Sequence, residues 1–374
     1  MRRLALVAFA VLMLAAPASA SARARWDTQV LALVPRPGFP ALSYVHPNGH
    51  IYEGTYDNPS GDTVPSRVFD YTADGTLVRS FVVAGQTLSQ AHGVQVATSD
   101  PQGRLVLLDK APARALLLDT RTGQQTTYAT FADLPSGGTP MPDYAAWGPD
   151  GSLYVTDYQQ PVLWRVPPGG GAAQPWLVDQ RLDGNMFGTA GIELMADRRT
   201  LMLSQASSAG LGELNPTTGK LYKVAIGADG KPGTLTKVWE SGPAEAPDGF
   251  AIAKSGRVYL ALVSPDANQL VVVAPDGKEV ERFPQSPGGG ENGSSVPFDS
   301  PSSVMFLGTS VVVANQSYVN GDATHQAILD VETGEEGMTP FIPPAPARAA
   351  APHRKAKHKK HRRHHRKHRR RHHR

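Results

Sequence analysis

The chain has no cysteine among its 374 residues, and aromatic side chains make up only 7% of it. The missing cysteine excludes disulfide bridges, thiolate metal ligands, a cysteine nucleophile and a lipidated N-terminal cysteine. The sequence lacks the pattern of a long amphipathic helix, and no apolar run reaches the roughly 20 residues of a membrane span. The fold therefore depends on burial, for which a chain of about 300 residues is long enough.

The N-terminal segment has the three parts of a secretory signal peptide. Arg2 and Arg3 supply the charged start, an apolar run extends from Leu4 to Leu14, and the small residues before Ser21 form a cleavage site. We predict a signal peptide over residues 1–20. The alternative, a membrane anchor, is weaker because the apolar run is too short to span a bilayer. We expect a secreted or extracytoplasmic monomer that associates with the cell envelope.

Charge is distributed unevenly along the chain. Residues 353–374 hold eight Arg, five Lys and eight His, so they contribute +13 to a net charge of +4 and leave −9 on the remainder. A Pro- and Ala-rich linker, residues 342–352, precedes them. We predict that this basic tail is disordered and binds anionic envelope polymers or lipid headgroups through counterion release, without specific nucleic-acid recognition. The alternative is a solubilising extension that has no partner.

Glycine and proline are abundant, at 37 and 32 residues. They stand in the turns of a sequence motif that recurs six times. Each copy contains a small or acidic residue, an apolar strand, a Gly-centred turn and a second apolar strand, as in residues 247–260. Such units bury their faces only against neighbouring copies, and their spacing is close to the roughly 40 to 50 residues of a propeller blade. The pattern predicts an all-β fold, a six-bladed β-propeller over residues 21–341. We expect residues 26–34 to pair with the last blade as its outer strand, because this protects an open edge.

The first residues of the six inner strands are expected to form a ring at one mouth of the central channel. They are Pro40, His92, Asp143, Ala190, Asp248 and Ser302. Two carboxylates at this mouth favour a hard divalent cation, Ca²⁺ more than Zn²⁺, and an imidazole suits proton transfer near neutral pH. The alternative is that the carboxylates only cap backbone amides in turns.

The Pro247-Asp248-Gly249 copy, with the other five in phase, resembles the senescence marker protein, gluconolactonase and luciferin-regenerating enzyme family, the regucalcin-like propellers. The resemblance covers residues 40–341. It implies a six-bladed propeller that holds Ca²⁺ or Zn²⁺ with carboxylate and Asn side chains and opens lactones or related esters. Asp248 matches the family's metal-binding aspartate, which is also proposed to handle the proton, and Asp143 stands where an Asn ligand is usual. Two positions depart from the family's pattern. Pro40 stands in place of a glutamate ligand, and Ala190 stands in place of a second Asn.

These residues give two hypotheses for the function. In the first, a cation bound by Asp143 and Asp248 polarises a lactone or ester carbonyl, and Asp248 or His92 takes the proton of the attacking water. Further pocket residues in this hypothesis are Glu53, Ser302 and Asn315. In the second, the same mouth belongs to a non-catalytic ligand-binding propeller that its basic tail tethers to envelope polyanions.

Overall fold

The computed structural model describes residues 23–135, 138–184, 187–207 and 217–345. The predicted signal peptide and the basic tail lie outside these residues, and the linker is described only in its first four residues. The described chain is all-β, apart from the short 3₁₀ helix η1 (Gln180–Leu182). None of its helical residues forms a segment with the length and apolar character of a membrane span.

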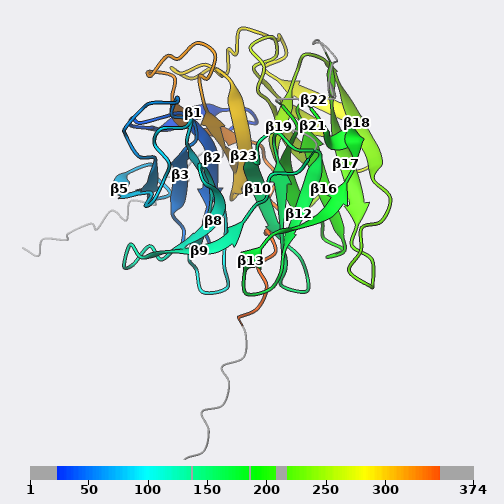
Figure 1. Ribbon diagram of the computed structural model, residues 1–374. Coiled ribbons are helices and arrows are strands. Elements are labelled where there is room, and N and C mark those ends of the chain that lie inside the picture. Colours follow the sequence, from blue (N-terminus) through cyan, green and yellow to red (C-terminus); the bar gives the residue numbers. More distant parts are fainter. Residues whose placement is uncertain (1–22, 136–137, 185–186, 208–216, 346–374) are drawn as a thin grey trace, which may run out of the picture. The chain divides into compact units, whose positions relative to one another are not determined.

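Six antiparallel sheets form the blades of a propeller, as the repeat predicts (Figure 1). In blades one to five, the strands follow one another outward in chain order. Blade one contains β2 (Pro40–Val45), β3 (Ile51–Thr55), β4 (Arg67–Tyr71) and β5 (Leu77–Val82), and blade two contains β6 (Val94–Ser99), β7 (Leu105–Lys110), β8 (Ala113–Leu118) and β9 (Gln125–Thr130). Blade three contains β10 (Pro142–Trp147), β11 (Leu153–Asp157), β12 (Val162–Val166) and β14 (Gln174–Val178), and β13 (Gly171–Ala172) pairs in parallel with β9.

The second half of the ring repeats this order. Blade four contains β15 (Thr189–Leu194), β16 (Thr200–Gln205), β17 (Thr218–Ala225) and β18 (Thr236–Pro243), and blade five contains β19 (Pro247–Ile252), β20 (Val258–Leu262), β21 (Gln269–Val273) and β22 (Glu279–Phe283). Blade six contains β23 (Pro301–Leu307), β24 (Ser310–Asn315) and β25 (Ala327–Glu332). Its fourth strand is β1 (Thr28–Leu33), which pairs antiparallel with β25. The predicted closure of the last blade by the opposite end of the chain is therefore confirmed.

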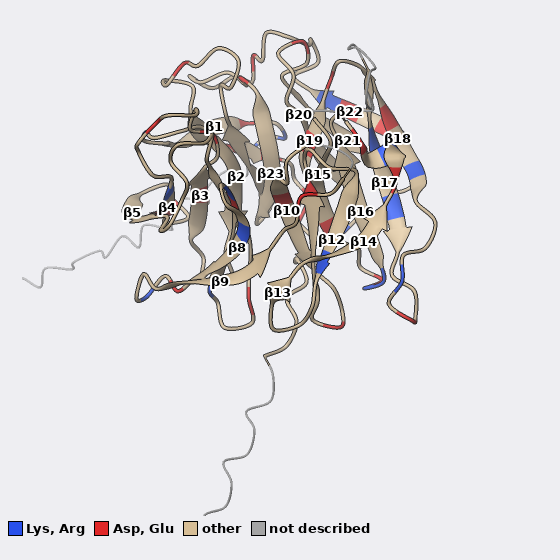
Figure 2. Cartoon of the chain, viewed as in Figure 1, with Lys and Arg blue, Asp and Glu red and all other residues tan. Residues whose placement is uncertain are grey.

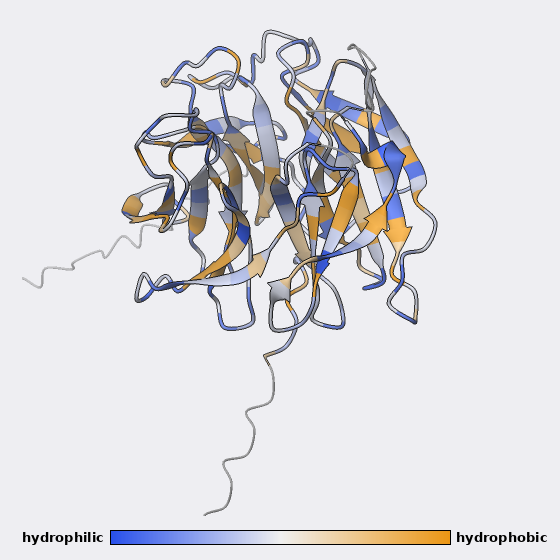
Figure 3. Ribbon diagram, viewed as in Figure 1, coloured by the Kyte–Doolittle hydropathy of each residue, from blue (hydrophilic) through white to orange (hydrophobic). Residues whose placement is uncertain are grey.

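Burial falls from the axis outward. The middle strands, such as β21, are buried on both faces because each blade packs against two neighbours, and they are accordingly continuous apolar runs. The outer strands, such as β22, are largely exposed, and in Figure 3 they alternate between hydrophobic and hydrophilic residues. Figure 2 shows basic residues on β17 and both basic and acidic residues on the outer strand β18. The core therefore lies between the blades and around the inner strands.

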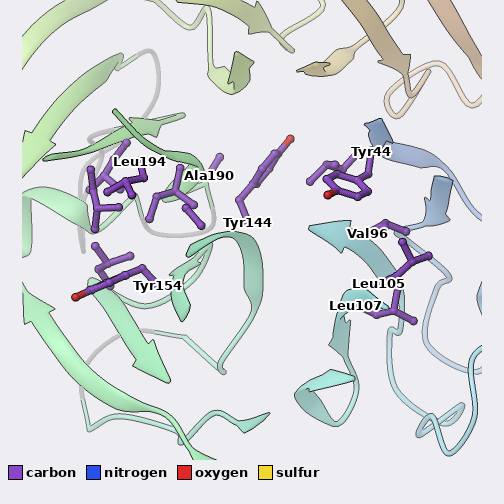
Figure 4. Packing of buried hydrophobic residues seen from close by; sticks show 14 of the residues in the cluster. Tyr44, Val96, Leu105, Leu107, Tyr144, Tyr154, Ala190 and Leu194 are labelled. Carbon is purple, nitrogen blue, oxygen red and sulfur yellow. The ribbon is translucent and has the colours of Figure 1, made fainter. Parts of the chain in front are cut away.

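The inner strands form the wall of a central channel. In order around the ring, β2, β6, β10, β15, β19 and β23 each contact the next, and β23 contacts β2 again. Figure 4 shows Tyr44 of β2 and Tyr144 of β10 reaching inward, with Ala190 and Leu194 on the neighbouring β15. Large side chains thus fill the middle of the channel.

Candidate functional site at one mouth of the channel

The inner strands share an irregularity near their starts. The register of the pairing between the first two strands shifts between Pro142 and Ala145 in blade three and between Pro247 and Phe250 in blade five. Corresponding shifts occur near the starts of β2, β15 and β23. A β-bulge of this kind bends a strand and redirects a side chain. The bulges contain Asp143 and Asp248, so the repeat itself gives these two carboxylates their unusual direction.

Asp143 and Asp248 both line a cavity of about 460 Å³. We call it the acid cavity. Its volume lies within the roughly 300 to 1,000 Å³ of small-molecule sites. Its walls also include aromatic side chains from several blades: Tyr56, Tyr144, Tyr158, Phe187 and Tyr318. The structure thus brings together the two carboxylates that the sequence analysis selected.

Asp143 is buried, with 2% of its surface exposed, but it has partners that favour its charge. Gln95 donates a hydrogen bond from Nε2 to its Oδ1 atom. Burial raises the pKa of Asp143 to about 8, against the opposing effects of Gln95 and of the positive charge of Lys110. Lys110 also pairs with Asp57, with 2.8 Å between Nζ and Oδ1. Asp143 is therefore a buried acid with two neighbours that make its ionised form less costly.

Asp248 lacks that support. Its side chain is partly exposed to the cavity, and no residue of the described chain donates a hydrogen bond to its carboxyl group. Burial and the charge of Asp143 raise the pKa of Asp248 well above its ordinary value. Because two carboxylates in one buried site resist ionising together, the pair keeps at least one proton at neutral pH. We assign this proton to Asp248, because no hydrogen-bond donor stabilises its ionised form.

His92 does not line the acid cavity. Its Nδ1 atom lies 2.9 Å from the carbonyl oxygen of Gln90, and its Nε2 atom lies 2.8 Å from that of Val64. Its backbone also pairs with Asn58 in an isolated bridge. Both ring nitrogens are thus engaged by carbonyl groups, and the ring connects two loops beside the channel mouth.

The three further pocket candidates also lie outside the lining of the acid cavity. Glu53 accepts hydrogen bonds from the backbone amides of Ala41 and Leu42, at 3.0 and 3.3 Å, within the bulge of β2. Ser302 donates to the carbonyl oxygen of Ala41 at 2.9 Å. Asn315 donates through Nδ2 to two backbone carbonyls. These side chains hold the inner strands and loops in place.

A second ring of residues, which are not among those predicted from the sequence, lines the acid cavity. Its members stand at or directly after the end of the second strand of each blade, which pairs with the start of the inner strand. They are Tyr56, Lys110, Tyr158, Ala206, Val263 and Gln316. Successive residues of a strand face opposite sides. The neighbouring Asn315 was therefore selected one position too early, and the repeat could have indicated the correct position.

Tyr144 forms the floor of the acid cavity. It extends from β10 across the channel, and its hydroxyl group donates to the carbonyl oxygen of Ser302 on β23, at 3.0 Å. The two strands belong to blades three and six, which lie opposite each other in the ring. Gly249 makes room for this crossing, because a Cβ atom there would meet the Tyr144 hydroxyl and lie 2.8 Å from the Ser302 oxygen.

The donor set at the mouth does not fit Ca²⁺. This ion takes six to eight oxygen ligands. Four carboxylates line the cavity, those of Asp57, Asp143, Asp248 and Asp266, and Asp57 is already paired with the Lys110 ammonium group. Within the described chain, no group of three or more His, Cys, Asp or Glu side chains could hold a metal ion. The two departures noted in the sequence have a direct consequence here. Pro40 begins the inner strand of blade one, Ala190 is the second residue of the inner strand of blade four, and neither supplies a side-chain ligand.

Solved structures with a similar fold include a protein assigned as a gluconolactonase, at 16% identity and a TM-score of 0.55, with 84% of this chain and 94% of that chain covered. Regucalcin from Agrobacterium tumefaciens, a calcium-binding protein, matches at 14% identity and a TM-score of 0.54, with 85% and 99% covered. Luciferin-regenerating enzyme matches at 12% identity and a TM-score of 0.53, with 82% and 94% covered.

No protein-family model matches the chain, and no curated protein matches it by sequence. At these low identities, the structural likeness concerns the fold. The protein is therefore a six-bladed β-propeller with the fold shared by gluconolactonase, regucalcin and luciferin-regenerating enzyme.

Proposed function

We propose that the protein is a hydrolase of small lactones or related esters and that the reaction takes place at Asp143 and Asp248. The observation that carries the proposal is this pair of carboxyl groups, Asp143 buried and Asp248 partly exposed, with unequal surroundings in one cavity. Two acids whose environments separate their proton affinities supply a general base and a general acid. The likeness to a gluconolactonase fold supports the same class of substrate.

In this proposal Asp143 is the base, because Gln95 and Lys110 stabilise its ionised form. It accepts a proton from a water molecule as the water oxygen attacks the ester carbonyl carbon. Asp248 is the acid, and it gives its proton to the ring or ester oxygen as the carbon–oxygen bond breaks. The product is a hydroxy acid, or an alcohol and an acid. Transfer of the proton from Asp143 through solvent to Asp248 restores the starting state.

A divalent cation is not a participant in this proposal. If a cation bound between Asp143 and Asp248, it would polarise the carbonyl group and lower the pKa of both acids. While no cation is bound, burial favours acids that retain a proton. The proposal assigns general acid–base catalysis to the chain's own residues, and the expectation of Ca²⁺ from the sequence stays a prediction that removal of metal ions tests.

A non-catalytic ligand-binding propeller is the second candidate. The other polar residues predicted for the mouth favour it. His92, Ser302 and Asn315 all form hydrogen bonds with backbone carbonyl groups, so they do not assist the two carboxyl groups in a reaction. Tyr56, Tyr158 and Tyr318 would then form an aromatic enclosure for a bound ligand. This candidate requires binding at the same cavity without turnover.

The basic tail and the signal peptide extend the proposal to location. We propose that the chain is exported and that residues 353–374 hold it on anionic polymers or lipid headgroups of the cell envelope. The support is the contrast between +13 on the tail and −9 on the remainder. Cations at this density bind polyanions largely by releasing counterions.

A panel of lactones and aryl esters assayed with the wild type, Asp248→Asn and Asp143→Asn tests the reaction. We expect kcat/KM to fall by about 10² or more in either variant, which is the scale of a lost general acid or base. Asp276→Asn, in an exposed turn, is the matched control. If the panel shows no turnover while calorimetry shows ligand binding that Asp248→Asn weakens, the binding candidate replaces the hydrolase.

A further inference from the structure

The opposite mouth of the channel contains a second cavity, with a volume of about 390 Å³. We call it the apolar cavity. The acid cavity is lined by residues from the starts of the inner strands, such as Ala41 and Asp143, whereas this one is lined by their ends, such as Val45, Trp147 and Leu194. Because Tyr144 borders both, its crossing of the channel separates them. They are therefore two distinct sites on one axis.

The walls of the apolar cavity are mostly aromatic and aliphatic. Five different inner strands contribute large apolar side chains: Tyr44, Tyr144, Ile192, Phe250 and Met305. Figure 4 shows Tyr44, Tyr144 and Leu194 on strands that face the middle of the ring. Rigid, apolar walls with few polar groups are typical of sites for small organic molecules.

Glu193 is the carboxyl group inside this apolar lining. It lies on β15, only 9% of its surface is exposed, and Oε2 accepts a hydrogen bond from the backbone amide of Ile252 at 3.1 Å. No residue of the described chain donates to its other oxygen. Burial raises the pKa of Glu193 to about 8. At neutral pH the group therefore carries a proton that it can donate to a ligand.

The other titratable groups around the cavity do not supply a net charge inside it. Burial lowers the pKa of His46, so this ring is neutral at pH 7. Lys254 and Glu336 form an ion pair at the mouth, where both side chains are more than half exposed. The phenols of Tyr44 and Tyr144 stay protonated because burial raises the pKa of each. The interior is thus neutral, and it carries a hydrogen-bond donor on Glu193.

Residues 336–342, which follow the last blade, line the apolar cavity together with the inner strands. The backbone holds this segment in place: Lys254 donates to the carbonyl oxygen of Glu336, and Met338 donates to that of Ile252, both at 2.8 Å. The ring of Phe341 packs against the core, and the guanidinium carbon of Arg198 lies 5.2 Å from its centroid. Figure 1 shows this end of the described chain, in orange-red, leaving the ring at the face opposite the loops above β2 and β23. The cavity is therefore enclosed by a fixed segment of the same chain.

We propose that the apolar cavity is a second small-molecule site, which takes a neutral, largely apolar ring compound with a hydrogen-bond acceptor directed at Glu193. A carboxylate ligand would place its charge beside a buried acid, and a free ammonium would leave water for a neutral pocket, so both are disfavoured. A carbonyl or ether oxygen accepts the Glu193 proton without that cost. The site is independent of the proposed hydrolysis at Asp143 and Asp248.

Prodan, a neutral naphthalene with one carbonyl group and polarity-sensitive fluorescence, is a suitable probe. We expect saturable binding to the full chain with emission shifted to shorter wavelength. Ala146→Trp places an indole in the apolar cavity, and we expect it to weaken binding by more than tenfold. Val263→Trp fills the acid cavity instead and is the matched control, with unchanged prodan affinity.

The role of Glu193 is tested by two substitutions. Glu193→Leu removes the donor, and we expect a loss of affinity of several-fold to about tenfold, the scale of one hydrogen bond. Glu193→Gln keeps an acceptor for Ile252 and a donor for the ligand, so its affinity should stay close to that of the wild type. Each variant is accepted only with a melting temperature and a near-ultraviolet circular dichroism spectrum like those of the wild type.

A crystal structure of the wild-type protein with prodan keeps the proposal testable if the variants do not fold. Density for the probe between Glu193 and Tyr44 supports the site. Absence of saturable binding overturns the proposal, as does probe density in the acid cavity or loss of binding in Val263→Trp but not in Ala146→Trp.

Discussion

The hydroxyl group of Tyr144 on blade three donates a hydrogen bond to the backbone carbonyl oxygen of Ser302 on blade six, at 3.0 Å, across the axis of the propeller. A propeller channel is often an open passage through the ring. Here one tyrosine divides it into an acid cavity and an apolar cavity with different chemistry. The two cavities are therefore separated within one channel.

Gly249 is the residue that permits this crossing. Gly249→Ala adds a methyl group where the Tyr144 hydroxyl and the Ser302 carbonyl already lie, so we expect a loss of about 1–3 kcal/mol in the free energy of unfolding, typical of overpacking. Urea denaturation measures the loss. Tyr144→Phe is the comparison, because it removes only the hydrogen bond, which contributes about 1 kcal/mol. Equal stability of Gly249→Ala and the wild type would contradict the packing described.

Glu53 makes stability depend on pH. Burial raises its pKa from 4.5 to about 8, so the folded state holds this proton more strongly than the unfolded chain. The contribution to stability is complete below about pH 4.5 and is lost as pH rises to about 8. We expect the melting temperature to decrease over this interval, and Glu53→Gln, which cannot ionise, to reduce the slope. The same slope in the variant would assign the effect to other buried acids.

The proposed general base makes a specific prediction for the rate profile. Asp143 must lose its proton to accept one from water, and its pKa is raised to about 8 by burial. We expect kcat/KM for a lactone substrate to increase as pH rises through about 8 while Asp248 remains protonated. Gln95→Leu removes the hydrogen bond that favours the ionised form and should move this increase to higher pH. An increase centred near pH 4 would remove Asp143 from this role.

Removal of metal ions distinguishes the proposed metal-independent site from a calcium site. Because no three acidic or histidine side chains of the described residues are grouped as metal ligands, we expect dialysis against a chelator to leave turnover and the melting temperature unchanged. Regucalcin from Agrobacterium tumefaciens, the calcium-binding protein of similar fold, is the control for the treatment. Loss of turnover that added Ca²⁺ restores would instead support a metal-dependent mechanism.

Deletion of residues 353–374 tests the proposed tether. We expect the full chain to bind anionic cell-wall material or vesicles with anionic headgroups at low salt, and the retained fraction to fall steeply as salt is raised. The truncated chain should show little retention at any salt concentration, with lactone turnover unchanged. Retention that survives the deletion would place the binding surface on the propeller itself.

Much of the architecture could be predicted from the sequence because the blade is repeated. Six copies of one motif identify the strands more reliably than the pattern of any single strand. The turn at Asn48-Gly49 has the glycine conformation that such a hairpin requires, with φ of 87° at Gly49. The outer strand β1 was predicted from the need to protect an edge, and it pairs with β25 as expected.

The site was only partly accessible from the sequence. Asp143 and Asp248 were found because each begins a copy of the repeat, yet the same rule also selected His92, which binds two loop carbonyls instead. Lys110 ends a second strand and Tyr158 directly follows one, so neither begins a copy of the repeat. Only the pairing of those strands with the inner strands places them beside the carboxylates. The apolar cavity depends on residues 336–342, whose position no local pattern specifies.

The pairing of β1 with β25 also determines when the ring can close. β1 is made first and its partner is made last, so the contacts between them join residues such as Thr28 and Val331 from opposite ends of the chain. Pairings of such long sequence separation form slowly, because the chain between them must be ordered or confined first. During synthesis the sixth blade lacks its own outer strand until nearly the whole chain has emerged. The growing chain therefore remains an open arc, without a sealed channel or either of its two cavities in final form, until its last strands are present.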